Sequence, residues 1–204
     1  MRRRAFTLIE LAIASAITSL VALAVAGTLS TTATLMDRED RAAASSAMLA
    51  RAEARVADHA ERARLVLYQD SDEVLLWLPS EPFTSSATNT AEYDRIDANE
   101  LAWYLMDAST GTLSLLSTSN RSDRTVLPLS TDWHALRLSM QVQSRLASTP
   151  VLRELAEGAF RVESNDACSV RRFTFSGRLS DTAGGADVEL GGRLANGQRH
   201  PDCP

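Results

Sequence analysis

Hydrophobic and polar positions divide the N-terminal third of the chain into two helical patterns. The run Leu11–Met36 contains no charged residue and exceeds the about 20 residues that a helix needs to cross a membrane. Beyond it, apolar residues recur at spacings of three, four and seven, the spacing of one helix face. They are Leu35, Ala42, Leu49, Ala52, Val56, Ala60, Ala63 and Leu67. Because residues 28–78 contain neither Gly nor Pro, the pattern predicts one very long helix whose second half is amphipathic.

After Tyr68 the pattern changes to short segments that are typical of β-strands. The run Gln69–Glu73 ends the predicted helix, and the polar residues 79–99 predict a long surface loop. The segments that predict strands are Val74–Leu78, Leu101–Met106, Thr112–Leu116, 136–143, 159–164, 171–179 and 187–194. The second and third of these flank "DASTG", which is a hairpin signal. We therefore expect an α+β fold, in which the amphipathic half of a long N-terminal helix packs on an antiparallel sheet.

Composition and charge narrow the function classes. The 204 residues carry a formal net charge of −5, so the chain as a whole offers no positive field to nucleic acid. A loose basic group near the C-terminus is interpreted as a solvated sheet face, with DNA capture as the alternative; it comprises Arg171, Arg172, Arg178, Arg193 and Arg199. The sequence contains no G-x-S-x-G element, phosphate-binding loop or dinucleotide fingerprint. We expect a non-catalytic protein without a cofactor.

The candidate metal ligands form only weak patterns. No pair among His59, His134 and His200 has the spacing of a metal site. Two acidic clusters have a faint calcium-like spacing, namely Asp70, Asp72 and Glu73, and Asp181, Asp187 and Glu189. Turn chemistry explains both clusters better, so we predict no metal site.

The N-terminus carries a basic start followed by an apolar run, which several targeting signals share. A secretory signal peptide would be cleaved after the A-x-A site Ala24–Ala26, and Arg3–Phe6 resembles the core of a twin-arginine signal. Neither signal explains Glu10, which stands where the apolar region begins. An ionised carboxylate in a membrane costs about 2.5–3.5 kcal/mol on insertion scales and requires a partner.

The stretch "RRRAFTLIELAIA" resembles the N-terminal signal of the type IV prepilin and pseudopilin superfamily. That resemblance implies cleavage between Ala5 and Phe6 by a membrane prepilin peptidase, which then methylates the new amine of Phe6. It also implies that Glu10 pairs with the Phe6 amine of a neighbouring subunit, since opposite charges attract strongly at low dielectric constant. Ala5 departs from the Gly that the family usually has before the cut.

The resemblance implies four segments: a leader at 1–5, a transmembrane assembly helix at 6–36, its amphipathic continuation at 37–68 and a periplasmic β-rich domain at 69–204. The three leading arginines orient the N-terminus toward the cytoplasm of a single-pass inner-membrane protein. The implied partners are other pilins or pseudopilins, the peptidase, the inner-membrane assembly platform and membrane lipid.

The resemblance predicts a structural minor pilin or pseudopilin of a type IV pilus or type II secretion filament. The order of segments is also similar to W-type minor pilins and J-type pseudopilins. The alternative is a membrane-anchored or exported enzyme or binding protein with an ordinary signal.

The two cysteines, Cys168 and Cys203, have neither C-x-x-C spacing nor a histidine pair nearby. If the domain lies outside the cytoplasm, a disulfide is the natural interpretation, and two buried or free thiols are the alternative.

We predict that Cys168 and Cys203 form one disulfide, which closes the loop 169–202 and stabilises the fold by about 4 kcal/mol in the chain-entropy model. Thiol labelling of the unfolded, unreduced protein checks this. Reduced protein provides the positive control, and two reactive thiols without reduction would contradict the prediction.

Overall fold

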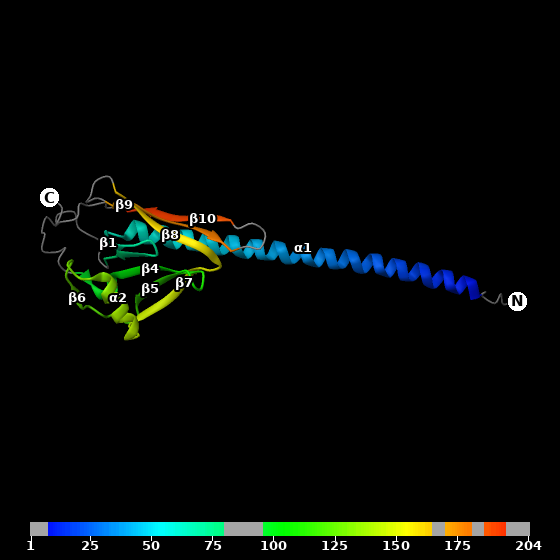
Figure 1. Cartoon of the computed structure of the whole chain (residues 1–204), viewed down its shortest axis with the longest axis horizontal. Helices are drawn as coiled ribbons and strands as arrows, with labels where there is room; N and C mark the ends of the chain where they lie inside the picture. The colour runs from blue at the N-terminus through cyan, green and yellow to red at the C-terminus, as the bar shows by residue number, and fades with distance from the viewer. Residues whose placement is uncertain (1–7, 80–95, 165–169, 181–185, 195–204) are drawn as a thin grey trace. The chain divides into compact units, whose positions relative to one another are not determined.

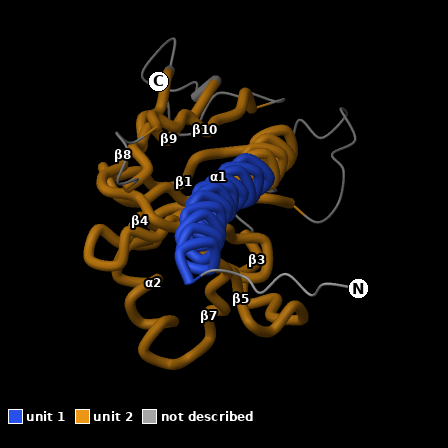
Figure 2. Tube along the Cα trace, turned by 90° about the vertical axis from the view of Figure 1, so that its right-hand side faces the viewer, with its two compact units in different colours: residues 1–48 blue, residues 49–204 orange. Residues whose placement is uncertain are grey.

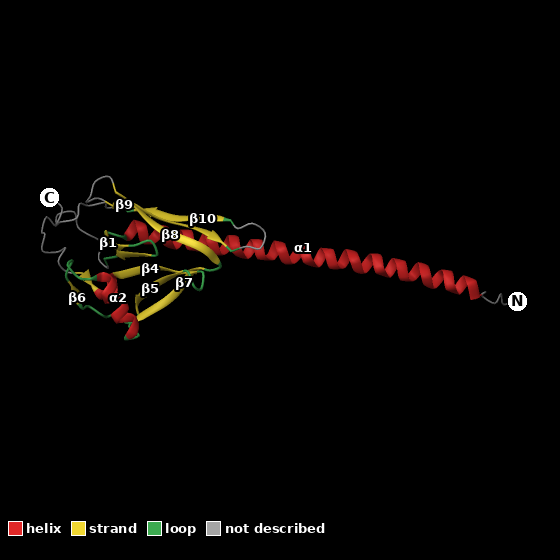
Figure 3. Cartoon of the chain, in the orientation of Figure 1, coloured by secondary structure: helices red, strands yellow, loops and turns green. Residues whose placement is uncertain are grey.

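The computed structural model describes residues 8–79, 96–164, 170–180 and 186–194. Its helices are α1 (Leu8–Arg62), the short 3₁₀ helix η2 (Ala98–Glu100) and α2 (Trp133–Val142) (Figures 1 and 3). Its strands are β1 (Leu65–Gln69), β2 (Glu73–Trp77), β3 (Ile96–Asp97), β4 (Leu101–Asp107), β5 (Thr112–Thr118), β6 (Val126–Leu127), β7 (Leu146–Leu152), β8 (Leu155–Ser164), β9 (Val170–Leu179) and β10 (Asp187–Arg193). The predicted α+β fold class is confirmed.

The chain divides into two compact units, residues 1–48 and 49–204, and α1 contributes to both (Figure 2). The second unit contains all the strands. They form a five-stranded sheet in the order β1-β2-β4-β5-β7, a three-stranded sheet in the order β10-β9-β8, and the pair β3-β6. Every pairing in these sheets is antiparallel, as the sequence predicts.

The predicted hairpin at 101–116 is confirmed as β4 and β5. Asp107 ends β4, and its carboxylate accepts hydrogen bonds from the backbone and hydroxyl groups of Ser109 and Thr110. Gly111 closes the turn with a φ of +60°, a conformation that glycine adopts without strain. Its carbonyl accepts a bond from the Leu155 amide, which ties the start of β8 to this turn.

The last turns of α1 bury a stripe of small side chains within the second unit. Ala52, Val56 and Ala60 are at most 2% exposed, and their spacing of four places them on one helix face. Gly192 of β10 lies directly against this face, because a Cβ atom added there would come within 2.1 Å of the Ala60 Cβ. The predicted packing of the amphipathic half-helix on a sheet is confirmed for these residues.

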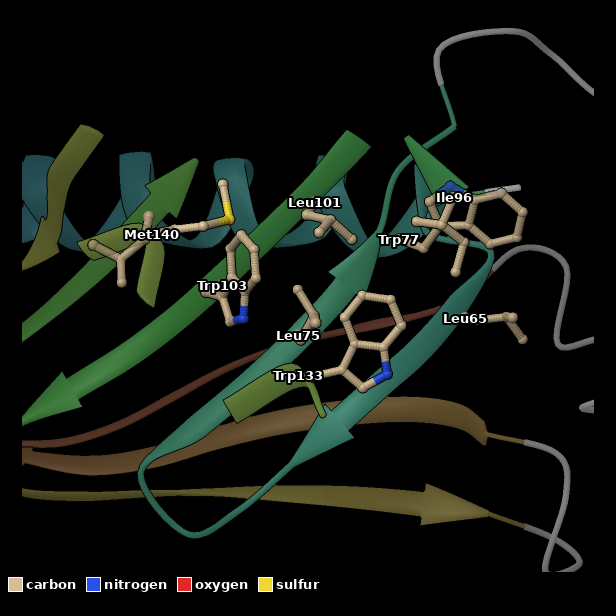
Figure 4. Close-up of a cluster of buried hydrophobic side chains, with 9 residues drawn as sticks. Leu65, Leu75, Trp77, Ile96, Leu101, Trp103, Trp133 and Met140 are labelled. Carbon is tan, nitrogen blue, oxygen red and sulfur yellow. The ribbon is translucent and has the colours of Figure 1, made fainter. Parts of the chain in front are cut away.

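The two central strands, β2 and β4, are covered on both faces, and their side chains alternate between them. One face carries Tyr104, whose hydroxyl contacts His59 of α1. The other belongs to a core that includes side chains of α2 (Figure 4). Its buried members are Leu65, Leu75, Trp77, Ile96, Leu101, Trp103, Leu116, Trp133 and Met140. The five-stranded sheet therefore lies between the end of α1 and α2.

Two predicted element assignments are wrong. Helix α1 ends at Arg62 rather than at residue 68, and Leu65–Gln69 instead form β1. No Gly or Pro marks this end. The helical spacing of Leu67 coexists with a β-favouring run of branched and aromatic residues, and antiparallel pairing with β2 decides the outcome.

Residues 136–143, predicted as a strand from their alternation, lie largely in α2. The Asp132 carboxylate caps this helix by accepting a bond from the Ala135 amide at 3.0 Å. Trp133, Arg137 and Met140, which have helical spacing, are buried, whereas Leu138 and Val142 are exposed. Of the loop predicted at 79–99, residues 80–95 lie outside the described residues, and 96–100 form β3 and η2.

We predict that Gly192→Ala lowers the free energy of unfolding by about 1–3 kcal/mol, because the added methyl overpacks the contact with Ala60. Urea unfolding of the full chain in detergent micelles measures the loss. Gly27→Ala is the matched control, since nothing lies within 4 Å of its added Cβ. The double variant Ala60→Gly/Gly192→Ala should lose less than the sum of the single losses. A Gly192→Ala protein as stable as wild type would contradict the prediction.

Candidate functional site

The first candidate site is the apolar surface of α1 in the first unit. Every residue from Leu8 to Ser46 is exposed in the isolated chain, and this part of α1 is apolar enough to cross a membrane. The uncharged run Leu11–Met36 extends over about 39 Å at 1.5 Å per residue, more than the about 30 Å of a hydrocarbon core. The large apolar side chains exposed within it are Leu11, Ile13, Ile17, Leu20, Val21, Leu23, Val25, Leu29, Leu35 and Met36.

Seven of the eight hydroxyl groups in this run are accommodated within the helix itself. Seven Ser and Thr side chains donate to backbone carbonyls three or four residues earlier, at 2.8–3.0 Å. They are Ser15, Thr18, Ser19, Thr28, Thr31, Thr32 and Thr34. Polar groups that bond inside their own helix add little cost in lipid. These hydroxyls are therefore compatible with a membrane environment.

Glu10 lies in the first turn of α1, and its side chain is exposed. A carboxylate at this position interacts favourably with the positive end of the helix dipole. Ala5 and Phe6, where the sequence predicts processing, lie outside the described residues, as do Cys168 and Cys203. The structure thus places one of the predicted site residues, Glu10, on the exposed surface of α1.

Comparison with protein families gives one match, and it falls on this segment. Residues 1–26 match the model of the prokaryotic N-terminal methylation motif. The chain carries a prepilin-type signal. This is the signal of type IV pilin and pseudopilin proteins. It includes Ala5, Phe6 and Glu10, so the predicted recognition is confirmed. Neither the curated proteins nor the solved structures give a match.

The prepilin-type signal and the apolar helix together are consistent with a membrane-anchored, single-pass protein. They support a pilin-type protein that is processed at its N-terminus and assembles with other pilin subunits. The matched residues end at Ala26, within the apolar run.

The second unit contains a buried charged cluster that the sequence analysis missed. Glu73, at the start of β2, is 1% exposed, and its carboxylate accepts a bond from the Arg137 Nε atom at 2.7 Å. Its other oxygen lies 3.2 Å from Nδ1 of His134. Arg137 also donates to the side-chain carbonyl of Gln141 at 3.1 Å. These bonds join α2 to the five-stranded sheet.

Contacts within the chain involve two of the three carboxylates of the calcium-like pattern at 70–73, those of Asp70 and Glu73. Glu73 is occupied by Arg137 and His134, and the Asp70 carboxylate accepts a bond from the Ser71 amide at 2.6 Å. Among the described residues, no group of three or more His, Cys, Asp or Glu side chains is arranged to hold a metal ion. Asp181, of the second acidic cluster, and His200 lie outside those residues. Asp132 is the sequence signal that could have indicated this cluster. As a helix cap it identifies α2, and helical spacing then places Arg137 on the same face as Trp133 and Met140.

We predict that Arg137→Met lowers the free energy of unfolding by about 3–5 kcal/mol, because it leaves the Glu73 carboxylate buried without its cation. The double variant Glu73→Leu/Arg137→Met should recover most of the loss, since two apolar side chains need no partner. Urea unfolding measures both. Arg178→Met is the control, because its pairs with Asp187 and Glu157 are exposed and should contribute less than about 1 kcal/mol. Equal effects of Arg137→Met and Arg178→Met would contradict the prediction.

Proposed function

We propose that this protein is a minor pilin or pseudopilin, a structural subunit of a type IV pilus or type II secretion filament. The observation that carries the proposal is the prepilin-type signal at residues 1–26, continuous with a helix whose apolar surface is exposed from Leu8 onward. This surface is exposed on all sides of the helix from Leu8 to Ser46, rather than along one stripe, which suits a helix that exchanges lipid for neighbouring helices.

In this proposal, prepilin peptidase cleaves between Ala5 and Phe6 and methylates the Phe6 amine. The helix 6–36 anchors the precursor in the inner membrane with a short cytoplasmic N-terminus, and the domain after residue 68 lies in the periplasm. The assembly platform then transfers the subunit into the filament. No catalytic step is assigned to the chain itself.

The proposed assembly contact joins Glu10 to the amine of Phe6 on a neighbouring subunit. An ionised carboxylate is only a hydrogen-bond acceptor, and a methylated terminal amine is a cationic donor. In a low-dielectric environment each charge is unfavourable alone, and the pair is tolerated. Pairing between subunits therefore favours the assembled state over the separate subunits.

The N-terminus of the mature protein tests the proposal. A protein purified from membranes should begin at N-methylated Phe6 by mass spectrometry. A start at Gly27 would indicate an ordinary signal peptidase, and Met1 would indicate an uncleaved anchor; either would contradict the proposal.

Ala5→Leu should block cleavage, because the peptidase must fit a small residue beside the scissile bond. Ala26→Leu, at the competing A-x-A site, is the matched control and should be processed like wild type.

We predict that Glu10→Leu leaves a processed, folded protein in the membrane but removes it from filaments. Leucine inserts into lipid more readily than glutamate, yet it offers no charge to an incoming Phe6 amine. Cell fractionation compares the membrane and sheared-filament pools, and Glu10→Asp, which keeps the charge, should retain part of the filament pool. If Glu10→Leu entered filaments as well as wild type, the carboxylate would have no part in assembly.

A further inference from the structure

The last turns of α1 make a polar contact with the face of the five-stranded sheet that they cover. The Tyr104 hydroxyl of β4 lies 2.8 Å from Nδ1 of His59, and the two rings meet edge to face with centroids 5.8 Å apart. Tyr104 is fully buried, whereas His59 is partly exposed. The ring of Phe173 of β9 also lies near the tyrosine ring, with centroids 6.3 Å apart. The contact therefore lies at the junction of the helix with both larger sheets.

The 2.8 Å contact fits either direction of donation, and the burial of Tyr104 favours the direction in which its hydroxyl donates to a neutral imidazole. A tyrosine hydroxyl donates to Nδ1 only when that nitrogen carries no proton, which places the imidazole proton on Nε2. Protonation of Nδ1 would turn this acceptor into a donor. The Tyr104 hydroxyl would then have to turn its hydrogen away from His59, which is its hydrogen-bond partner among the described residues. A buried hydroxyl that loses its acceptor keeps an unsatisfied donor, which is unfavourable.

The surroundings also disfavour a charged imidazole. Burial is the largest effect and lowers the pKa of His59, while Asp58 opposes this shift and Arg62 and Arg55 add to it. Asp58 is itself paired with Arg62 at 3.4 Å. Burial raises the pKa of Tyr104, so its hydroxyl stays a donor throughout the neutral range.

The neighbouring strands β9 and β10 contribute Phe173 and Gly192 at this junction, and neither residue carries a charge. Within the described part of the chain, the charged groups that act on His59 are Asp58, Arg62 and Arg55, all on its own helix. We propose that His59 and Tyr104 form an acid-sensitive latch, which holds residues 49–62 of α1 on the sheet in neutral solution and loosens them in mild acid.

The direction of the effect follows from linkage. A histidine whose pKa is lower in the folded state binds its proton more readily when the chain opens. The stability that this contact contributes is complete above the ordinary histidine value of 6.5 and is lost progressively as the pH falls below it. Acid thus favours states in which His59 has left Tyr104.

Hydrogen exchange of the full chain in detergent micelles, at about pH 7.5 and about pH 5.5, tests the latch. After correction for intrinsic rates, amides of residues 49–62 in the wild-type protein should be less protected at the lower pH. His59→Asn offers an acceptor in place of Nδ1 that cannot titrate, and it should abolish most of this difference. His134→Asn, which alters the histidine on α2, is the matched control and should leave it unchanged. The same pH difference in wild type and His59→Asn would overturn the proposal.

A second measurement tests the proposal even if the His59→Asn variant does not fold. Nuclear magnetic resonance titration of the wild-type imidazole should give His59 a pKa below 6.5. In Tyr104→Phe, which loses the hydrogen bond to neutral imidazole, the His59 titration should move upward. A His59 that titrates at or above the ordinary value in the wild-type protein, or equally in both proteins, would overturn the proposal.

Discussion

The second unit depends on a close approach between the end of α1 and the strands that follow it. Ala60 of α1 and Gly192 of β10 meet so closely that Gly192 has no room for a methyl group. Small residues on both sides therefore set the distance between the helix and the strands. That separation brings His59 within hydrogen-bond distance of Tyr104. It also explains why the buried helical stripe consists of Ala52, Val56 and Ala60 rather than of larger apolar residues. A helix with leucines at these positions would lie farther out and would separate the histidine from its tyrosine.

The opposite side of the five-stranded sheet is organised by charge as well as by apolar packing. Trp133 and Met140 of α2 enter the core, and Arg137 between them meets the buried Glu73 carboxylate. Because an unpaired ion in such a place is strongly unfavourable, this pair permits few alternative positions for α2. We infer that the ion pair restricts the register of the helix on the sheet, beside the apolar contacts of Trp133 and Met140.

The parts of the fold that the sequence predicted are those with an unambiguous local pattern. The long helix, the hairpin at 101–116 and the strands that contain Phe160, Phe175 and Leu190 follow from residue spacing alone. Residues 65–69 and 136–143 carry patterns that fit two structures. Pairing with the neighbouring strand β2 decided the first case, and the cap Asp132 with the distant, buried Glu73 decided the second. For the candidate site, the signal at residues 1–26 was predictable because it is a contiguous motif. The buried charged cluster was not, since Glu73 lies 61 residues from His134 and 64 from Arg137, and the cap Asp132 signals helix α2 without identifying its partner.

The polar groups of the apolar helix differ in what they require from their surroundings. A hydroxyl is both donor and acceptor, so seven of the eight Ser and Thr side chains in the apolar run can donate to a carbonyl of their own helix, whether lipid or protein surrounds it. These residues therefore make the helix compatible with a membrane without selecting a partner. An ionised carboxylate cannot donate to a carbonyl, and its charge is best compensated by a cation. In the proposed filament that cation is the Phe6 amine of another subunit. Glu10 therefore gives the apolar helix a preference for binding another pilin subunit over remaining in lipid.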